Sequence, residues 1–446
     1  MNSLKKIKIG DILELITDYH SNGAYKKLKE NVELLDKENY AVMIRTLNFE
    51  RQDFKDDLLY VTKKAYDFLE KSSVIPNDIL MNKIANAGSV YIMPDMQKPV
   101  TCGMNLFLIR FNDTVNQRYM YYNMKNVEQY IKSFAHGTTT TTITKDEVRN
   151  IDLYIHSKKE QGKIEKLLTS IDKKIENNKK INSELESMAK TIYDYWFLQF
   201  EFPNEEGKPY KSSGGKMVWN EELGREIPEG WEVYKVKDCT KHINTGLNPR
   251  DNFKLGNGNI KYITVKNITT DGTIDFSGCD VIDEAARSVV HKRSQVSKGD
   301  ILFASIAPLG RCIIVQEEPD NWDINESVFS IRPNTQRVCT EYLYMFFMSD
   351  YFVKKAEHSS TGSVFNGIRI STLEEMNILI PNEVIMKNFM LKTQNIFYMK
   401  YKNEKENQNL VSLRDFLLPL LMNGQVGFKE NINIKDIEVG KEEVLT

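Results

Sequence analysis

Two stretches of the chain carry apolar residues at alternating spacings of four and three residues on a polar background. In the first stretch the series comprises Ile164, Leu168, Ile171, Ile175, Leu185, Ala189, Ile192 and Trp196. In the second stretch it runs from Phe389 to Leu421 and includes more polar members, among them Lys400 and Arg414. A heptad spacing places one narrow apolar stripe along a helix, which is typical of a coiled coil. The pattern predicts long helices over residues 157–200 and 385–423.

Two asparagines interrupt the apolar series of the first helix. Asn178 and Asn182 take the positions that the series skips, and an offset of 225 residues (403 − 178) places them on Asn403 and Asn407. A buried asparagine pair lowers the stability of a coiled coil but fixes its register and partner. We therefore predict that these four asparagines set the helix–helix register. An exposed, solvated face is the alternative interpretation.

The rest of the sequence is also duplicated. Asp78-Ile79-Leu80 matches Asp300-Ile301-Leu302 at an offset of 222 residues (300 − 78). Further matches keep the same order: Phe107, Ile109 and Arg110 with Phe329, Ile331 and Arg332, Asn22-Gly23 with Thr245-Gly246, and Met43 to Asn48 with Tyr262 to Asn267. An ordered series of this kind indicates a true internal repeat. Because Arg110 and Arg332 recur in both halves, we expect structural or phosphate-binding roles for them.

Each half begins with a region of mixed pattern. Short β-branched runs such as those around Val90, Leu106, Lys261 and Cys312 predict strands, and segments 117–134 and 341–356 predict helices. The predicted fold class is α+β. Two similar mixed α/β domains, 1–156 and 231–384, are joined by two long antiparallel coiled-coil helices with an internal pseudo-two-fold repeat. A Gly- and Pro-rich linker occupies 201–230, and 424–446 form a C-terminal tail.

Composition narrows the class of protein. The net charge is −2 and hydrophobic residues make up 41%, which fits a packed globular protein and excludes a polycation. The five cysteines form no paired motif, so neither a disulfide framework nor a zinc finger is expected, and a cytoplasmic location is predicted. No stretch approaches the ~18 apolar residues of a membrane span.

Motifs of catalysis are not recognisable in the sequence. It has no GxGxxG turn, no GxxxxGK[ST] phosphate loop and no ligand-like pair of histidines, so no catalytic residue and no metal site is predicted. We expect a non-catalytic protein that binds no cofactor itself. A nuclease or modification enzyme with a divergent site, and a protein scaffold without DNA specificity, remain alternatives.

Two similar modules held apart by antiparallel helices suit the recognition of two half-sites on double-stranded DNA. Polar, glycine-containing loops at corresponding places of the halves are the candidate contacts, and ordinary turns are the alternative. In the first half the candidates are Ser21, Asn22, Gly23, Tyr25, Arg45, Thr46, Lys83, Asn86, His136, Thr138, Thr139 and Thr140. In the second half they are Thr245, Asn248, Arg250, Lys266, Asn267, Ser305, Arg311, Thr361, Ser363 and Asn366.

Several motifs point to a known family. They are the segment from Lys298 to Phe303 with Gly310-Arg311, the segment from Asn325 to Pro333, Tyr193 to Phe197 with Phe202-Pro203, Ile227 to Trp231, and Leu417 to Val426. In this order and spacing the chain resembles the specificity (S) subunit of type I restriction–modification systems over residues 1–430. The first half departs from the pattern, since Met81-Asn82-Lys83 stands where the second half has Phe303-Ala304-Ser305.

The resemblance implies a function and a set of partners. It implies two target recognition domains that read a bipartite, asymmetric target, two methyltransferase (M) subunits bound to the helices, and a restriction (R) subunit. S-adenosylmethionine, ATP and Mg²⁺ would belong to these partners. We also expect Tyr193, Tyr195, Phe197 and Leu198 to be exposed and to contribute to the surface that faces them. The specificity subunit of a bipartite-target type II system is a related alternative.

Overall fold

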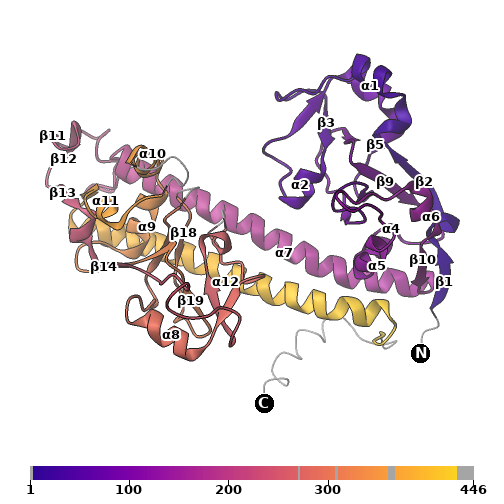
Figure 1. Cartoon of the computed structure of the whole chain (residues 1–446). Helices are drawn as coiled ribbons and strands as arrows, with labels where there is room; N and C mark the ends of the chain where they lie inside the picture. Colours follow the sequence, from indigo (N-terminus) through magenta and orange to yellow (C-terminus); the bar gives the residue numbers. More distant parts are fainter. Residues whose placement is uncertain (1–3, 270–271, 307–309, 360–366, 429–446) are drawn as a thin grey trace. The chain divides into compact units, whose positions relative to one another are not determined.

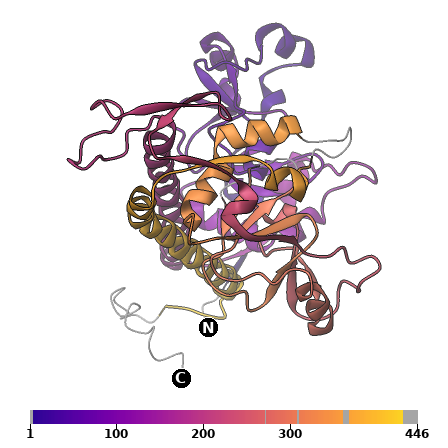
Figure 2. The ribbon, with the colours of Figure 1, turned by 90° about the vertical axis from the view of Figure 1, so that its left-hand side faces the viewer.

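The computed structural model describes residues 4–269, 272–306, 310–359 and 367–428. The chain divides into two compact units. Unit 1 contains the described parts of 1–175 and 409–446, and unit 2 contains those of 176–408. Helix α7 (Lys158–Tyr193), which ends in a π-helical turn (Asp194–Leu198), and helix α12 (Glu383–Met422) each pass from one unit into the other. Both views show these two helices side by side (Figure 1 and Figure 2).

Unit 1 contains two four-stranded sheets and a strand pair. The first sheet has the antiparallel order β2 (Leu13–Asp18), β9 (Leu106–Phe111), β6 (Ile79–Asn82), β7 (Val90–Ile92). The second has the order β4 (Leu59–Val61), β3 (Ala41–Ile44), β8 (Val100–Cys102), β5 (Ser73–Val74), with β3 parallel to β8. Strand β1 (Lys5–Lys8) pairs with β10 (Asp152–Ile155). The region before α7 therefore begins and ends on neighbouring strands.

Short helices connect the strands of unit 1. The α-helices are α1 (Tyr25–Asn31), α2 (Thr46–Glu50), α3 (Lys63–Phe68), α4 (Gln117–Asn126), α5 (Glu128–Lys132) and α6 (Lys145–Asn150). Single 3-10 turns lie at Ile9–Ile12, Tyr19–Asn22 and Glu70–Ser72. Thr144 caps α6 by accepting a hydrogen bond from the backbone N–H of Glu147, and the carboxylate of Glu147 accepts a bond from the backbone N–H of Thr144. This capping box fixes where α6 begins.

Unit 2 repeats this arrangement. Its four-stranded antiparallel sheet has the order β14 (Thr240–Thr245), β20 (Val328–Pro333), β17 (Ile301–Ala304), β18 (Cys312–Ile314). Its second sheet has the order β16 (Asp280–Ile282), β15 (Ile260–Ile263), β19 (Trp322–Ile324), with β15 parallel to β19. Strand β13 (Glu232–Lys235) pairs with β21 (Asn377–Ile380), and the α-helices are α8 (Glu284–His291), α9 (Thr340–Met348), α10 (Asp350–Ser359) and α11 (Ile370–Glu374). Single 3-10 turns lie at Val236–Cys239 and Val265–Asn267.

The repeat extends to individual hydrogen bonds. Arg110 pairs with Asp78 through two contacts of 2.8 and 2.7 Å, and Arg332 pairs with Asp300 through contacts of 2.7 and 2.9 Å. Of the two roles expected for these arginines, structural or phosphate-binding, the ion pairs support the structural one. A bulge interrupts the pairing of β2 with β9 and of β14 with β20 at the same place.

Packing explains the composition of the two cores. Strands β6 and β17 are buried along their full length, so their residues are apolar on both faces, with the buried Asn82 at the end of β6 as the exception. Helix α9 is buried on nearly all sides, which explains its content of Tyr, Phe and Met. In unit 2 the rings of Trp196, Phe197, Trp231 and Phe389 pack together with centroid separations between 4.9 and 6.2 Å. Such an aromatic cluster buries a large apolar area.

Three segments differ from their predicted form. The expected linker contains the hairpin β11 (Met217–Asn220) and β12 (Arg225–Pro228), and Phe202 and Ile227 are buried in the core of unit 2. The glycines and prolines of this segment predict its turns, but they do not predict that its apolar residues pack into the core of unit 2. The expected helices over 117–134 and 341–356 are each divided, into α4 and α5 and into α9 and α10.

The buried ion pair of unit 2 generates a prediction about stability. Asp300 is fully buried and accepts hydrogen bonds from Arg332, Ser330 and the backbone N–H of Ser297. Asp300→Asn should lower the free energy of unfolding of unit 2 by about 2–3 kcal/mol, because charge-assisted bonds are lost and Arg332 stays partly buried. Thermal unfolding measures the change. The exposed Asp251→Asn serves as the control, and equal melting of the two variants would contradict the structural role.

Candidate DNA-recognition loops and helical scaffold

The long helices pack antiparallel within each unit. In unit 2, Glu186 contacts Lys400, and ten residues further along α7 the Trp196 ring lies 6.0 Å from that of Phe389 on α12. In unit 1, Arg414 donates a 3.0 Å bond to Asp172. Residue numbers rise along α7 as those of their partners fall along α12, which defines antiparallel helices. The predicted apolar series of α7 is buried except for Ile192, which is partly buried, and even Lys400, a polar member of the second series, is only 7% exposed.

Two asparagine pairs lie in the seam of unit 2. Asn178 donates a 2.9 Å hydrogen bond to Oδ1 of Asn407, and Asn403 donates a 2.8 Å bond to Oδ1 of Asn182. Asn178 also donates to Glu406, and Asn182 to the backbone carbonyl of Lys400. Asn178 and Asn182 are buried, so the exposed face considered as an alternative does not describe them. The contacts cross between repeat equivalents, as a pseudo-two-fold axis requires.

Each recognition domain is tied to the helices of its own unit. In unit 1, the hydroxyl of Tyr122 on α4 donates a 2.5 Å hydrogen bond to Asp172, which also accepts the bond from Arg414. In unit 2, Lys405 on α12 forms a 2.6 Å ion pair with Glu317, and the rings of Tyr344 and Phe397 lie 5.2 Å apart. A cavity of about 330 Å³ lies beside these contacts.

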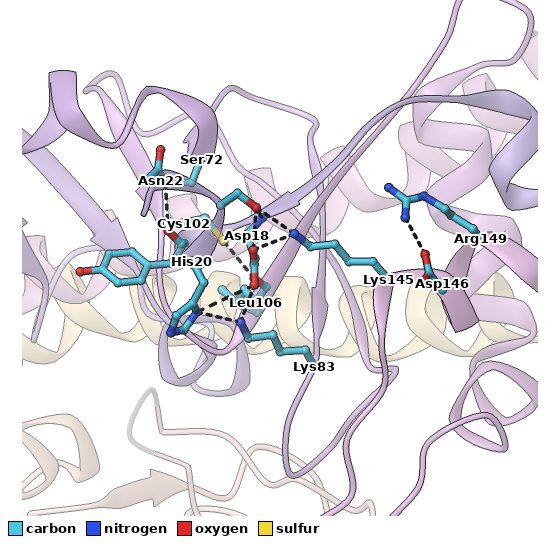
Figure 3. A network of polar contacts seen from close by, with 12 residues as sticks. Asp18, His20, Asn22, Ser72, Lys83, Cys102, Leu106, Lys145, Asp146 and Arg149 are labelled. Carbon is cyan, nitrogen blue, oxygen red and sulfur yellow. Dashed lines mark hydrogen bonds and ion pairs between the residues drawn. The ribbon is translucent and has the colours of Figure 1, made fainter. Parts of the chain in front are cut away.

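Three predicted loops of unit 1 meet at Asp18, which ends strand β2. Lys83, directly after β6, places its ammonium 2.7 Å from one carboxylate oxygen of Asp18, and Lys145, the first residue of α6, lies 2.8 Å from the other. Ser21 donates a 2.8 Å bond to the same carboxylate, and Lys145 donates to Ser21. His20 lies 3.3 Å from the ammonium of Lys83. Figure 3 shows the Asp18 carboxylate between the two lysines, which approach it from different segments of the chain.

Burial and the neighbouring charges shift the pKa values of Asp18 and His20. Burial by itself raises the pKa of Asp18, but hydrogen bonds from Lys145, Lys83 and Ser21 outweigh burial and hold the pKa well below its ordinary value of 3.8. Burial and the charge of Lys83 lower the pKa of His20 from 6.5, so the imidazole is mostly neutral at pH 7. Asp18 is therefore ionised at neutral pH, and its carboxylate accepts hydrogen bonds from both Lys83 and Lys145.

Several predicted contacts of unit 1 are engaged inside the domain. Asn22 donates to Tyr19 and Ser72 and accepts a bond from the backbone of Lys71. Arg45 is tied to Asp57, and Thr46 donates to Asn82. His136 forms a 2.7 Å contact with Glu147 but remains exposed. The exposed candidates without a side-chain bond to another described residue are Tyr25, Asn86, Thr138, Thr139 and Thr140.

In unit 1, the loop that follows β6 and the turn that precedes α6 are joined by backbone bonds. Ile84 pairs with Thr142, His136 pairs with Thr142, and the N–H of Ile143 donates to the carbonyl of Lys83. The left-handed φ of Gly137 and the carbonyl of Thr140, which lies 2.3 Å from the place a Cβ would take, require glycine at this turn. The threonine run is therefore held as a turn beside Asn86.

The candidates of unit 2 are placed differently. Arg250 and Lys266 are exposed, while Asn248 donates a 2.9 Å bond to Glu326. Asn267 accepts bonds from Thr264 and donates to Asp275, and Asn48 makes the corresponding bonds in unit 1. Thr245 and Ser305 are buried, and Arg311 donates to the carbonyls of Val265 and Ile268. Thr361, Ser363 and Asn366 lie outside the described residues.

A comparison with protein families decides what this repeat is. The family model described as the type I restriction modification DNA specificity domain matches residues 1–187 and 228–411. These ranges take in the loops of both units and most of the two helices. The chain belongs to the type I restriction–modification DNA specificity family.

Other members of the family resemble the chain over most of its length. It is 27% identical over 385 residues to the type I restriction enzyme MjaIX specificity subunit of Methanocaldococcus jannaschii, covering 84% of this chain and 85% of that protein. It is 24% identical over 349 residues to the HindI specificity subunit of Haemophilus influenzae, covering 67% and 74%. The crystal structure of the S subunit from M. genitalium has a TM-score of 0.55 at 14% identity, covering 94% and 96%, and shows the same fold.

The structure corrects two sequence-based expectations about this family member. Asp18 stands opposite Phe107 and Thr245 stands opposite Phe329, so the equivalent of Thr245 is Asp18 rather than Asn22. Tyr193 and Phe197 are buried in the aromatic cluster of unit 2, whereas Tyr195 and Leu198 are exposed. The helical spacing of these four residues does not predict which of them pack into the aromatic cluster.

Sequence reasoning also missed two central members of the Asp18 cluster, Asp18 itself and Lys145. They are 127 positions apart, and no local pattern marks an ion pair at that separation. In the described part of the chain, no three His, Cys, Asp or Glu side chains gather as metal ligands would. Among the same residues no helix is long and apolar enough to cross a membrane.

The asparagine pairs generate a prediction about the scaffold. Asn178→Leu should lower the free energy of unfolding by about 1–3 kcal/mol, because Asn407 and Glu406 lose a donor inside the seam. Adding Asn407→Leu should restore part of this loss, since two leucines pack together. Chemical denaturation of both single variants and the double variant gives the coupling energy. Asn177→Leu, on the exposed side of α7, is the control, and additive effects would contradict the pairing.

Proposed function

We propose that the chain is the DNA-recognition subunit of a type I restriction–modification complex, and that each unit reads one half of a bipartite, asymmetric target. The observation that supports this most strongly is that the family match covers two copies of one fold whose loops differ. A shared framework with different loop side chains suits two different half-sites. The antiparallel helices would determine the spacing between them.

The exposed loop residues suit this task. Backbone phosphates supply affinity, while side chains at the base edges supply specificity. Asn86 has the amide that pairs with adenine, the hydroxyls and methyls of Thr138 to Thr140 fit base edges and thymine, and Arg250 fits guanine or phosphate. Residues engaged inside the domains, such as Asn22 and Asn267, shape the loops instead.

The proposal assigns the chemistry to partner subunits. Two methyltransferase subunits would bind S-adenosylmethionine and methylate adenines that they flip out of the duplex. A restriction subunit would use ATP and Mg²⁺. The chain itself would be cytoplasmic, would catalyse no step and would hold no cofactor. Its contribution would be to place these partners over one DNA sequence.

Exposed apolar residues on the helices are suitable docking points for the methyltransferases. Ile181, Met188 and Tyr195 are spaced by seven residues on α7 and are all exposed. The repeat places Leu413 of α12 at the position of Met188, and these side chains are 46% and 54% exposed respectively. Exposed apolar side chains at equivalent positions suit two copies of one partner.

An exchange of domains tests the proposed function. Residues 1–156 are closed by the β1–β10 pair, so the corresponding segment of another family member can replace them with little disturbance. Methylation sequencing of cells that carry the exchanged gene should show a target changed in one half only. Cells without the gene provide the baseline and should lose methyladenine at one split motif. A target altered in both halves, or in neither, would refute one domain per half-site.

Charge substitutions test the docking points. Met188→Asp and Leu413→Asp should each weaken the binding of one methyltransferase subunit about tenfold or more, because a buried contact becomes a desolvated charge. The double variant should lose both copies. Native mass spectrometry of the reconstituted complex counts the subunits. Ser187→Asp, beside Met188 but polar already, is the matched control, and unchanged stoichiometry in all variants would exclude this surface.

A further inference from the structure

The Asp18 cluster joins three loops of the first recognition domain. Asp18 ends β2, Lys83 follows β6, and Lys145 begins α6 directly after the threonine turn. The side chains of Asp18 and Lys83 are about one-tenth exposed, at 10% and 11%, and that of Lys145 is 28% exposed. A carboxylate shared by two ammonium groups at 2.7 and 2.8 Å holds the loops at one point (Figure 3).

Unit 2 has the same backbone at this place but different side chains. The N–H of Ile143 donates to the carbonyl of Lys83, and the N–H of Ile368 donates to that of Ser305, both at 2.9–3.0 Å. Ser305 is thus the equivalent of Lys83. Thr245 is the equivalent of Asp18, because each stands opposite a matching phenylalanine. The first residue of α11, Ile370, takes the place of Lys145, the first residue of α6.

The replacements remove the cross-loop ion pairs. Thr245 donates to the adjacent carbonyl of Gly246, and Ser305 donates to the carbonyl of Ser327. In contrast, the ion pair between Asp78 and Arg110 is repeated in unit 2. The framework is therefore preserved between the halves, whereas the junction of the loops has changed its chemistry. The side chains at this junction therefore distinguish the first domain from the second.

The tips of the same loops carry the exposed polar candidates. Asn86 lies three residues beyond Lys83, and the turn with Thr138, Thr139 and Thr140 ends a few residues before Lys145. The Ile84–Thr142 pairing ties the two tips together. A displacement of either lysine therefore moves both tips against the end of β2. Base-edge contacts depend on hydrogen-bond geometry, so small displacements change discrimination.

We propose that Asp18 is a positioning residue that fixes the three loops of the first domain, through Lys83 and Lys145, in the arrangement that discriminates the bases of the first half-site. This inference rests on the proposed function. It names the element that makes the first domain read a sequence different from that of the second. Neither lysine is assigned a DNA contact, because both are occupied by Asp18.

The test uses the full chain assembled with its methyltransferase subunits. DNA libraries randomised in either half of the target are methylated and sequenced, which gives the preference for each base. Asp18→Asn should lower discrimination in the first half-site about tenfold at one or more positions and leave the second half-site unchanged. Asp78→Asn, at the opposite end of β6, is the matched control. It breaks an ion pair of the same domain and should lower its melting temperature without changing base preference.

A second set of variants keeps the inference testable if Asp18→Asn does not fold. The triple change Asp18→Thr, Lys83→Ser and Lys145→Ile installs the side chains of unit 2, whose backbone tolerates them. It should fold and still lose discrimination in the first half only. Lys145→Arg should retain discrimination and Lys145→Met should not, because the charge holds the loop.

Three results would overturn the inference. The first is wild-type discrimination in both half-sites for the triple variant. The second is an equal loss in both half-sites, and the third is the same loss with Asp78→Asn; either of these would mark the cluster as structural only. If the wild-type complex methylates without any sequence preference, the proposed function fails instead, and that outcome is visible before any variant is compared.

Discussion

A long helix with one narrow apolar stripe cannot bury that stripe by itself. In this chain the stripe of α7 is covered by α12 and by the recognition domain of each unit. Every other feature depends on this shared seam, because the domains are fastened to it. Tyr122 reaches Asp172 in unit 1, and Glu317 reaches Lys405 in unit 2. A domain of this kind is positioned by the helices rather than by a linker.

Duplication has preserved different parts of the domain to different degrees. The strand order of the first sheet, the bulge in β2 and β14, the paired Arg and Asp, and the asparagine that closes a turn are the same in both copies. These features satisfy buried groups, and any copy that lost them would be unstable. The junction of the loops is free of that constraint, since an ion cluster and a set of small polar residues both fit the same backbone.

Features that follow from local or periodic patterns were predictable from the sequence. The repeat, the strands and the seam with its asparagines depend on spacing, which a single sequence displays. The Asp18–Lys145 contact depends on a fold that brings distant residues together, and no spacing shows it. The burial of Tyr193 and Phe197 depends on the aromatic cluster around Trp231, and the packing of the predicted linker depends on the same core. The sequence did not distinguish among the candidate DNA-contacting residues, such as Asn22. Their hydrogen bonds show which of them are engaged within the domain and which are exposed.

The charges within the seam have a consequence for partner choice. Both helices carry the same two asparagines, so the asparagines alone would accept a second copy of either helix. Lys400 and Arg414 each contact one carboxylate on α7, Glu186 and Asp172 respectively, and one on α12, Glu404 and Asp415 respectively. Two copies of α12 would lose the carboxylates that α7 supplies and would place additional cations in one seam, which is unfavourable. The polar members that make the second series look irregular thus favour the pairing of α12 with α7 over its pairing with a second α12.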